Sequence, residues 1–132
     1  MNAPDLPLCI KVHYVNDTAV VVRVTGELDT LTAPAVDAQL TATQAELTAP
    51  TAVVLDLSGL TFMSSAGLAL LATHHERCAE QGNRLLVVTG GNRSVLRPVS
   101  VTGLDTMLHL AATVRDATDA TGGKALTAVL DD

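Results

Sequence analysis

Residues 53–82 read V-V-L-D-L-S-G-L-T-F-M-S-S-A-G-L-A-L-L-A-T-H-H-E-R-C-A-E-Q-G, and they contain the strongest structural signal in the chain. The continuous apolar run at residues 53–57 is typical of a strand that is buried on both faces. A segment with helical periodicity follows after a short link, and Gly82 suits the position just beyond a helix. The predicted apolar stripe of this helix consists of Leu68, Leu71, Ala72, His75 and Ala79. A buried strand that leads directly into a long helix predicts an α/β domain.

Two serines, Ser64 and Ser65, lie where this helix is predicted to begin. The first backbone N–H groups of a helix lack intrahelical partners, and the helix dipole places partial positive charge there. A hydroxyl therefore caps this position well, and a phosphate group is tolerated there. The sequence at residues 63–67, M-S-S-A-G, lacks the first glycine of the G-x-S-x-G motif, which argues against a nucleophilic hydrolase.

The chain before this stretch predicts an antiparallel hairpin and one helix. Residues 8–15 alternate as in a half-buried strand, and residues 18–24 place three valines on one face. The Asn-Asp pair between them supplies turn chemistry. We expect Gly26 to end the second strand as a chain-reversal residue. A helix of about 14 residues should follow, with Pro34 in its first turn.

The chain after residue 82 predicts a second buried strand at residues 84–89, closed by two glycines. A helix at residues 92–102, a short strand at residues 106–110 and a helix that begins near residue 113 should follow. The predicted order is therefore ββαβαβαβα. It describes a mixed, mostly parallel sheet that begins with an antiparallel hairpin.

The length of 132 residues suits one domain with a single core. We expect residues 8–121 to form this domain, residues 1–7 to be a flexible leader, and residues 122–132 to be a C-terminal tail or a short helical end. An apolar content of 48% without a long uninterrupted apolar run predicts no insertion into a membrane. The first residues lack the features of a signal peptide, which favours a cytoplasmic protein.

Composition argues against direct binding of nucleic acid, because the formal net charge is −6 and the chain has one Tyr and one Phe.

Cys9 and Cys78 lack metal-ligand spacing and are expected to be core residues. Adjacent histidines point about 100° apart on a helix and do not readily share one metal ion, so we expect a buried His75 and a solvated His74. The sequence predicts no catalytic residue, cofactor or metal.

The segment D-L-S-G-L-T-F-M-S-S-A-G-L at residues 56–68 resembles the hallmark motif of anti-sigma factor antagonists, the single-domain bacterial STAS proteins. The usual form of that motif is close to D-x-S-x-x-x-F-M-D-S-S-G-L. The resemblance also covers T-G-E-L-D at residues 25–29, and it implies a STAS-like single domain over about residues 8–120. Two positions differ, because the usual aspartate is Ser64 here and the second serine is Ala66.

The resemblance implies a regulatory binding protein that is not an enzyme. In this family a partner anti-sigma factor, itself a serine kinase of ATPase fold, phosphorylates the first serine of the S-S-G-L unit. That serine aligns with Ser65, and Ser64 is the alternative acceptor. When it is unphosphorylated, such a protein sequesters the anti-sigma factor and releases a sigma factor. Phosphorylation switches it off, and a phosphatase resets it.

Two other functions are compatible with the same fold. The first is a STAS subunit of a transporter or signalling assembly, in which Ser65 would only be a contact residue. The second, from another class of protein, is a small-ligand or lipid-binding module.

Sites in parallel α/β sheets form in the loops that follow the carboxyl ends of the strands. The predicted loops here are residues 25–30, 59–65 and 90–94. If the strands that precede the first two loops are neighbours, Asp29 and Ser65 lie at the same edge of the sheet. The predicted partner-binding residues come from these two segments: Glu27, Asp29, Ser64, Ser65, Ala66 and Gly67.

Overall fold

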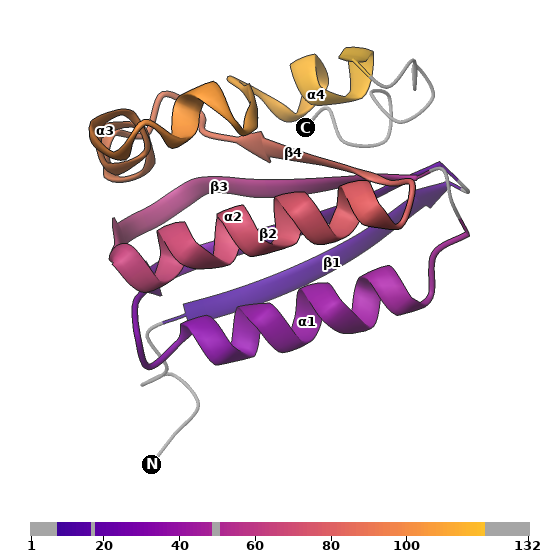
Figure 1. Ribbon diagram of the computed structural model, residues 1–132, viewed down its shortest axis with the longest axis horizontal. Coiled ribbons are helices and arrows are strands. Elements are labelled where there is room, and N and C mark those ends of the chain that lie inside the picture. The colour runs from indigo at the N-terminus through magenta and orange to yellow at the C-terminus, as the bar shows by residue number, and fades with distance from the viewer. Residues whose placement is uncertain (1–7, 17, 49–50, 121–132) are drawn as a thin grey trace.

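The computed structural model describes residues 8–16, 18–48 and 51–120 (Figure 1). Its elements follow the predicted order, with one additional 3₁₀ turn, so the predicted fold class is confirmed. In chain order they are β1 (Leu8–Asn16), β2 (Ala19–Leu28), α1 (Ala33–Ala45), β3 (Ala52–Met63), α2 (Ser65–Glu80), β4 (Arg84–Val88), α3 (Arg93–Thr102), η2 (Leu104–Thr106), β5 (His109–Ala111) and α4 (Val114–Ala120). The predicted leader, part of the hairpin turn and the predicted tail lie outside the described residues.

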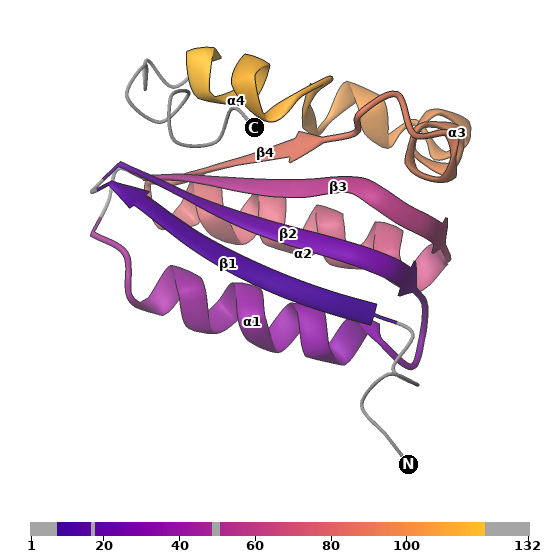
Figure 2. The same ribbon diagram turned by 180° about the vertical axis from the view of Figure 1, so that it is seen from behind.

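The five strands form one sheet in the order β1-β2-β3-β4-β5, with β1 at one edge and β5 at the other. β1 and β2 are antiparallel, and each later pair is parallel. The helices α1 and α2 pack on one face of this sheet, where they share the larger core cluster, and α4 packs on the other face. The two opposite views in Figures 1 and 2 show α2 in front of β3 and then behind it. The sheet is therefore the middle layer of the molecule.

Valine periodicity explains why β2 can lie in the middle of these layers. Val20, Val22 and Val24 belong to the core on the α1 and α2 side, whereas Val21 belongs to the cluster under α4. Successive side chains of a strand point to opposite faces, so an almost continuous valine run fills both cores. β-Branched side chains also suit the extended backbone.

β2 and β3 extend beyond the end of β4. The first half of β3 pairs with β4 from Ala52 to Asp56, whereas its second half, from Gly59 to Met63, pairs with the last residues of β2. The expectations that Gly26 ends a strand and that residues 59–63 form a loop are therefore wrong. Only Ser64 separates β3 from α2.

The extension of β2 depends on irregular pairing around Gly26. This residue has φ 107°, a backbone conformation that glycine adopts without strain, and the pairing register shifts between Gly26 and Glu27. The extra residue is Thr61 of β3, which lies between the partners of Gly26 and Glu27, and a bulge of this kind bends its strand and allows the next residues to pair again. Glu27 and Leu28 accordingly pair with Phe62 and Met63.

The structure separates the two cysteines. Cys78 is buried on α2 as expected, and burial raises the pKa of its thiol to about 11. Cys9 is exposed, so its assignment to the core is wrong. It lies on the edge strand β1, on the face opposite Leu8 and Ile10, which pack against the larger core cluster.

Candidate partner-binding site

The two predicted segments meet at one edge of the sheet, because β2 and β3 are parallel neighbours and end together. The amide of Ser64 donates a hydrogen bond of 2.9 Å to the carbonyl of Leu28, which joins the two strand ends. We call residues 27–31 and 62–66 the rim. The structure thus places the segment of Asp29 beside the segment of Ser65, as the predicted strand pairing requires.

Ser64 is the N-cap of α2. Its backbone is extended, with φ −92° and ψ −178°, and its Oγ accepts a hydrogen bond of 3.2 Å from the amide of Ala66. Of the two serines predicted at the helix start, Ser64 is therefore the one whose hydroxyl caps α2. The hydroxyl is engaged in holding the first turn of α2.

Ser65 has a different environment from its neighbour. It is the first residue of α2 and its side chain is exposed. In the part of the chain that the structure describes, its hydroxyl makes no hydrogen bond. A group attached to this oxygen would extend into solvent near helix N–H groups that lack intrahelical partners.

The carboxylate of Asp29 organises the loop between β2 and α1. Its Oδ1 accepts hydrogen bonds from the amides of Leu31, at 2.9 Å, and Thr32, at 3.0 Å. The Thr32 hydroxyl donates to the carbonyl of Glu27 at 2.8 Å and accepts from the amide of Asp29. Thr32 was not predicted as a site residue, although the spacing Asp29-x-x-Thr32 is typical of such reciprocal side-chain to backbone bonds.

Two large apolar side chains on the rim are exposed to solvent. Leu31 is 88% exposed and Phe62 is 49% exposed. Glu27, the cross-strand partner of Phe62, is also exposed. The sequence did not predict either residue as part of the site. An apolar residue beside a turn is usually interpreted as a core residue, and the sequence does not show whether its side chain points to the core or to solvent. Exposed aromatic and aliphatic side chains of this size are typical anchors of protein interfaces.

Gly67 allows the first turn of α2 to pack closely against the strand ends that carry the rim. It is buried, and a Cβ atom added to it would lie 2.7 Å from Cγ of Met63 and 3.0 Å from Cγ of Leu28. The absence of a side chain therefore lets the first turn of α2 rest directly on the ends of β2 and β3. Ala66 is half-buried beside it.

The third predicted loop braces the end of β3. The Asn92 side chain caps α3 through a bond of 2.9 Å from the amide of Ser94, and its Nδ2 donates to the carbonyls of Leu57 and Leu60 at 3.3 and 2.6 Å. One amide group thus connects the start of α3 with the projecting half of β3. This contact holds the strand that leads to Ser64 and Ser65.

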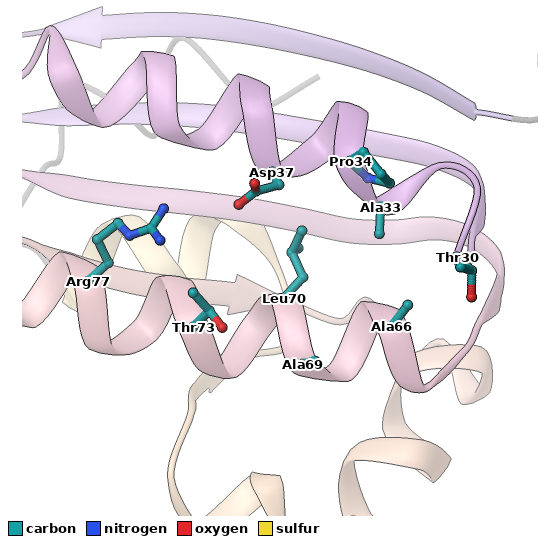
Figure 3. Close-up of a pocket in the computed structure, with 9 residues that line it drawn as sticks. All are labelled: Thr30, Ala33, Pro34, Asp37, Ala66, Ala69, Leu70, Thr73 and Arg77. Atoms are coloured by element: carbon teal, nitrogen blue, oxygen red, sulfur yellow. The ribbon is translucent and has the colours of Figure 1, made fainter.

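A groove lies between α1 and α2, and side chains from both helices line it (Figure 3). Its volume is about 440 Å³. Five of the nine lining residues are apolar, two are threonines and two are charged: Thr30, Ala33, Pro34, Asp37, Ala66, Ala69, Leu70, Thr73 and Arg77. Two of them, Thr30 and Ala66, also belong to the rim, so the groove begins where the rim ends.

A buried histidine lies between the same two helices. His74 of α2 is fully buried, its Nε2 lies 2.7 Å from Oδ1 of Asp37, and its Nδ1 lies 2.8 Å from Nε2 of Gln44. The expectation of a solvated His74 and a buried His75 is wrong, because His74 is the fully buried histidine and His75 is half-buried. Two side chains of α1 satisfy the hydrogen-bonding atoms of His74, and this removes the usual cost of burying a polar ring.

Burial lowers the pKa of His74 below its ordinary value of 6.5, and the nearby Arg77 acts in the same direction, whereas Asp37 acts against them. The folded protein therefore favours the neutral ring. We expect the stability that this ring contributes to be complete above about pH 6.5 and to be lost as the pH falls through the lowered pKa.

Thermal unfolding between pH 7.5 and 5 tests this expectation. The melting temperature of the wild-type protein should fall more steeply with acid than that of His74→Gln. The exposed His13 offers a matched control, since His13→Gln should keep the wild-type slope. Equal slopes for wild type and His74→Gln would contradict the assignment.

The described residues contain no group of three or more His, Cys, Asp or Glu side chains placed to hold a metal ion. Among the helices of residues 8–16, 18–48 and 51–120, none has the length and apolar character needed to cross a membrane.

Comparisons with known proteins agree with this architecture. The sequence profile of the STAS domain family matches residues 11–117. The chain is 36% identical over 125 residues to the anti-sigma-F factor antagonist RsfB of Mycobacterium tuberculosis, and the alignment covers 94% of this chain and 98% of RsfB. A solved anti-sigma factor antagonist from Mycobacterium paratuberculosis is 37% identical, with a TM-score of 0.77 and coverage of 91% of this chain and 97% of that one.

The fold is also that of the anti-sigma factor antagonist SpoIIAA, solved in its unphosphorylated form. The two chains are 23% identical, with a TM-score of 0.69 over 87% of this chain and 97% of SpoIIAA. The family match and the alignment with RsfB both span most of the chain, so this protein belongs to the STAS domain family, among members that are named anti-sigma factor antagonists.

Proposed function

We propose that this protein is an anti-sigma factor antagonist: it binds an anti-sigma factor through the rim, sequesters it, and thereby releases a sigma factor. The relatives described above support the class of partner, since RsfB is named an antagonist of an anti-sigma-F factor. The exposed Leu31 and Phe62 give the rim the apolar anchors that a protein interface needs. The protein acts in the cytoplasm as a binding protein, without catalysis.

The regulatory part of the proposal is phosphorylation of Ser65 by the bound anti-sigma factor, a serine kinase of ATPase fold that supplies the ATP. The observation that carries this assignment is the contrast between the two serines. The Ser64 hydroxyl caps α2, whereas Ser65 is exposed and its hydroxyl has no hydrogen-bond partner in the described chain. Ser65 can therefore accept a group without loss of the cap.

The position of Ser65 makes phosphorylation a change of surface rather than of fold. A phosphate adds about 1.5 to 2 negative charges, and a helix N-terminus accommodates them. The partner, however, meets a surface with new charge that must be desolvated on binding. We propose that the phosphorylated protein releases its partner and that a phosphatase restores the binding form.

Phosphorylation by the recombinant anti-sigma factors of ATPase fold from the same genome tests the acceptor assignment. With radiolabelled ATP, Ser65→Ala should abolish labelling. Ser64→Ala is the matched control, which should still be labelled while its free energy of unfolding falls by about 1 kcal/mol through loss of the cap. A phosphate located on Ser64 by mass spectrometry would contradict the assignment of Ser65. If the wild-type protein bound none of these anti-sigma factors, the proposed function itself would be wrong.

A further inference from the structure

We propose that the side-chain amide of Gln44 is a two-position switch set by the protonation of His74. One orientation of the amide holds the neutral ring, and the orientation turned by 180° holds the protonated ring. Both residues are buried where α1 packs against α2, with Nδ1 of His74 2.8 Å from Nε2 of Gln44 and Nε2 of His74 2.7 Å from Oδ1 of Asp37. This contact between two helices is separate from the rim, and the switch does not depend on the proposed function.

The neutral ring of His74 has a complementary partner at each nitrogen. The carboxylate of Asp37 can only accept a hydrogen bond, so Nε2 of the ring carries the proton and donates to this carboxylate. Nδ1 is then an acceptor, and it accepts from the Nε2–H group of Gln44. The neutral ring therefore requires the NH₂ end of the amide to face it.

This orientation leaves the oxygen of the same amide without a partner. Oε1 of Gln44 is buried and accepts no hydrogen bond from any described residue. A buried carbonyl oxygen without a donor lowers stability, and native proteins contain few of them. An unused acceptor is thus present on the group that already contacts the ring, and rotation about one side-chain bond brings it to Nδ1 of His74.

Protonation of His74 by solvent reverses the requirement at Nδ1. Both nitrogens of the protonated ring are donors, so Nδ1–H would face the N–H donors of Gln44. Turning the amide by 180° exchanges its oxygen and nitrogen with almost no change in shape. Oε1 then accepts from Nδ1–H, while Asp37 continues to accept from Nε2–H. Each orientation leaves one end of the amide without a ring partner, so the charge of the ring selects between them.

The charged and titratable groups around the ring set the pH at which the switch operates. Burial lowers the pKa of His74 below its ordinary value of 6.5, Asp37 opposes this shift and Arg77 adds to it. These two charged side chains project between α1 and α2 in Figure 3. Cys78 is neutral, because burial raises the pKa of its thiol to about 11.

The strands beneath the two helices add no charge to this face. The core side chains of β2 and β3 there are valines and leucines: Val20, Val22, Val24, Val53, Leu55 and Leu57. The amide of Gln44 is therefore the neutral polar group that can respond to the ring, and it turns as the pH falls below about 6.5.

Nuclear magnetic resonance between about pH 8 and 4.5, a range that spans the ordinary pKa of histidine, tests the switch. The nitrogen shifts of the ring give the titration midpoint of His74, and couplings across hydrogen bonds identify its partner atoms. Above the midpoint, Nε2 of Gln44 should couple to Nδ1 of His74. Below it, a coupling between Nδ1 and the carbonyl carbon of Gln44 should replace the first. A ring that becomes protonated in the folded protein without this second coupling would overturn the switch, and so would unfolding before the ring titrates.

Two variants with the same change in net charge complete the experiment. Gln44→Glu introduces a carboxylate that accepts hydrogen bonds as the turned amide does, and it should raise the titration midpoint of His74 by about one pH unit or more. Gln39→Glu is the matched control on α1, since Nε2 of Gln39 donates to the Thr43 hydroxyl at 3.0 Å, and it should shift the midpoint by less than about 0.3 unit. Equal midpoints in the two variants would mean that position 44 does not hold the protonated ring, and the switch would be wrong. Affinity for an anti-sigma factor tests the proposed function separately.

Discussion

Truncation of Leu71 to alanine is expected to lower the free energy of unfolding by about 2–5 kcal/mol. Leu71 lies on α2, is fully buried, and belongs to the core cluster between the helices and the sheet. The truncation removes buried apolar surface and leaves a cavity that the rigid sheet below cannot fill. Because single domains are stable by about 5–15 kcal/mol, this one change removes a large share of the total.

Urea unfolding monitored by circular dichroism measures this effect as a shift of the transition midpoint. Glu76→Ala is a suitable control, because Glu76 is an exposed residue of the same helix and its truncation should change stability by less than about 0.5 kcal/mol. If Leu71→Ala unfolded at the wild-type urea concentration, α2 would not be anchored to the sheet by this side chain.

Replacement of Ser65 by aspartate is expected to weaken binding to the anti-sigma factor about tenfold or more, which corresponds to about 1.4 kcal/mol. The carboxylate places a permanent negative charge at the first position of α2, where the phosphate of the proposed switch would stand. The fold should tolerate this charge, since the helix N-terminus favours an anion.

Ser65→Asn separates charge from shape in this experiment, because asparagine has nearly the same size as aspartate without its charge. Asparagine should keep the affinity within about threefold of wild type, since neutral surface changes of this size have small effects. Titration of both variants against the anti-sigma factor that wild type binds provides the comparison. Equal loss in both variants would mean that size at Ser65, and not charge, controls binding.

The parts of the fold that depend on local signals were predictable from the sequence. The apolar run at residues 53–57 identified the central strand, and the serine pair identified the beginning of α2, where Ser64 is the N-cap. The position of a buried strand and the beginning of a helix depend on residues only a few positions away, so a short stretch of sequence is enough to predict them. The shared edge of the two strand ends was predicted on the condition that β2 and β3 are neighbours, and the structure meets this condition.

The orientation of α2 was predicted with an error of one residue. The predicted stripe passed through His75, whereas the buried face passes through Leu71, His74 and Cys78. A polar residue enters a core only when partners satisfy it, and one partner of His74 is Asp37, which lies 37 positions earlier in the chain. Patterns within one helix contain no information on such a partner.

The groove and the bulged pairing near Gly26 could not be predicted from the sequence, because each depends on two segments that are far apart in the chain. Ala33 and Ala69 become two walls of one groove only when α1 and α2 are placed side by side. The sequence predicts a chain reversal at Gly26, because glycine is common in turns and the pairing of Glu27 with Phe62 cannot be recognised from one strand alone.

Among the described residues, the outer edge of β1 has no strand paired with it. An unpaired strand edge invites edge-to-edge pairing between chains and hence aggregation. β1 has an exposed lysine, Lys11, near its middle and an irregular register between Tyr14 and Asn16, and both features oppose such pairing. The strand at the opposite edge of the sheet, β5, has only three residues, so it presents few backbone groups with which another chain could pair. Under the proposed sequestration of an anti-sigma factor, the protein has to accumulate to the level of its partner, and these features of the two edge strands oppose self-association at that concentration.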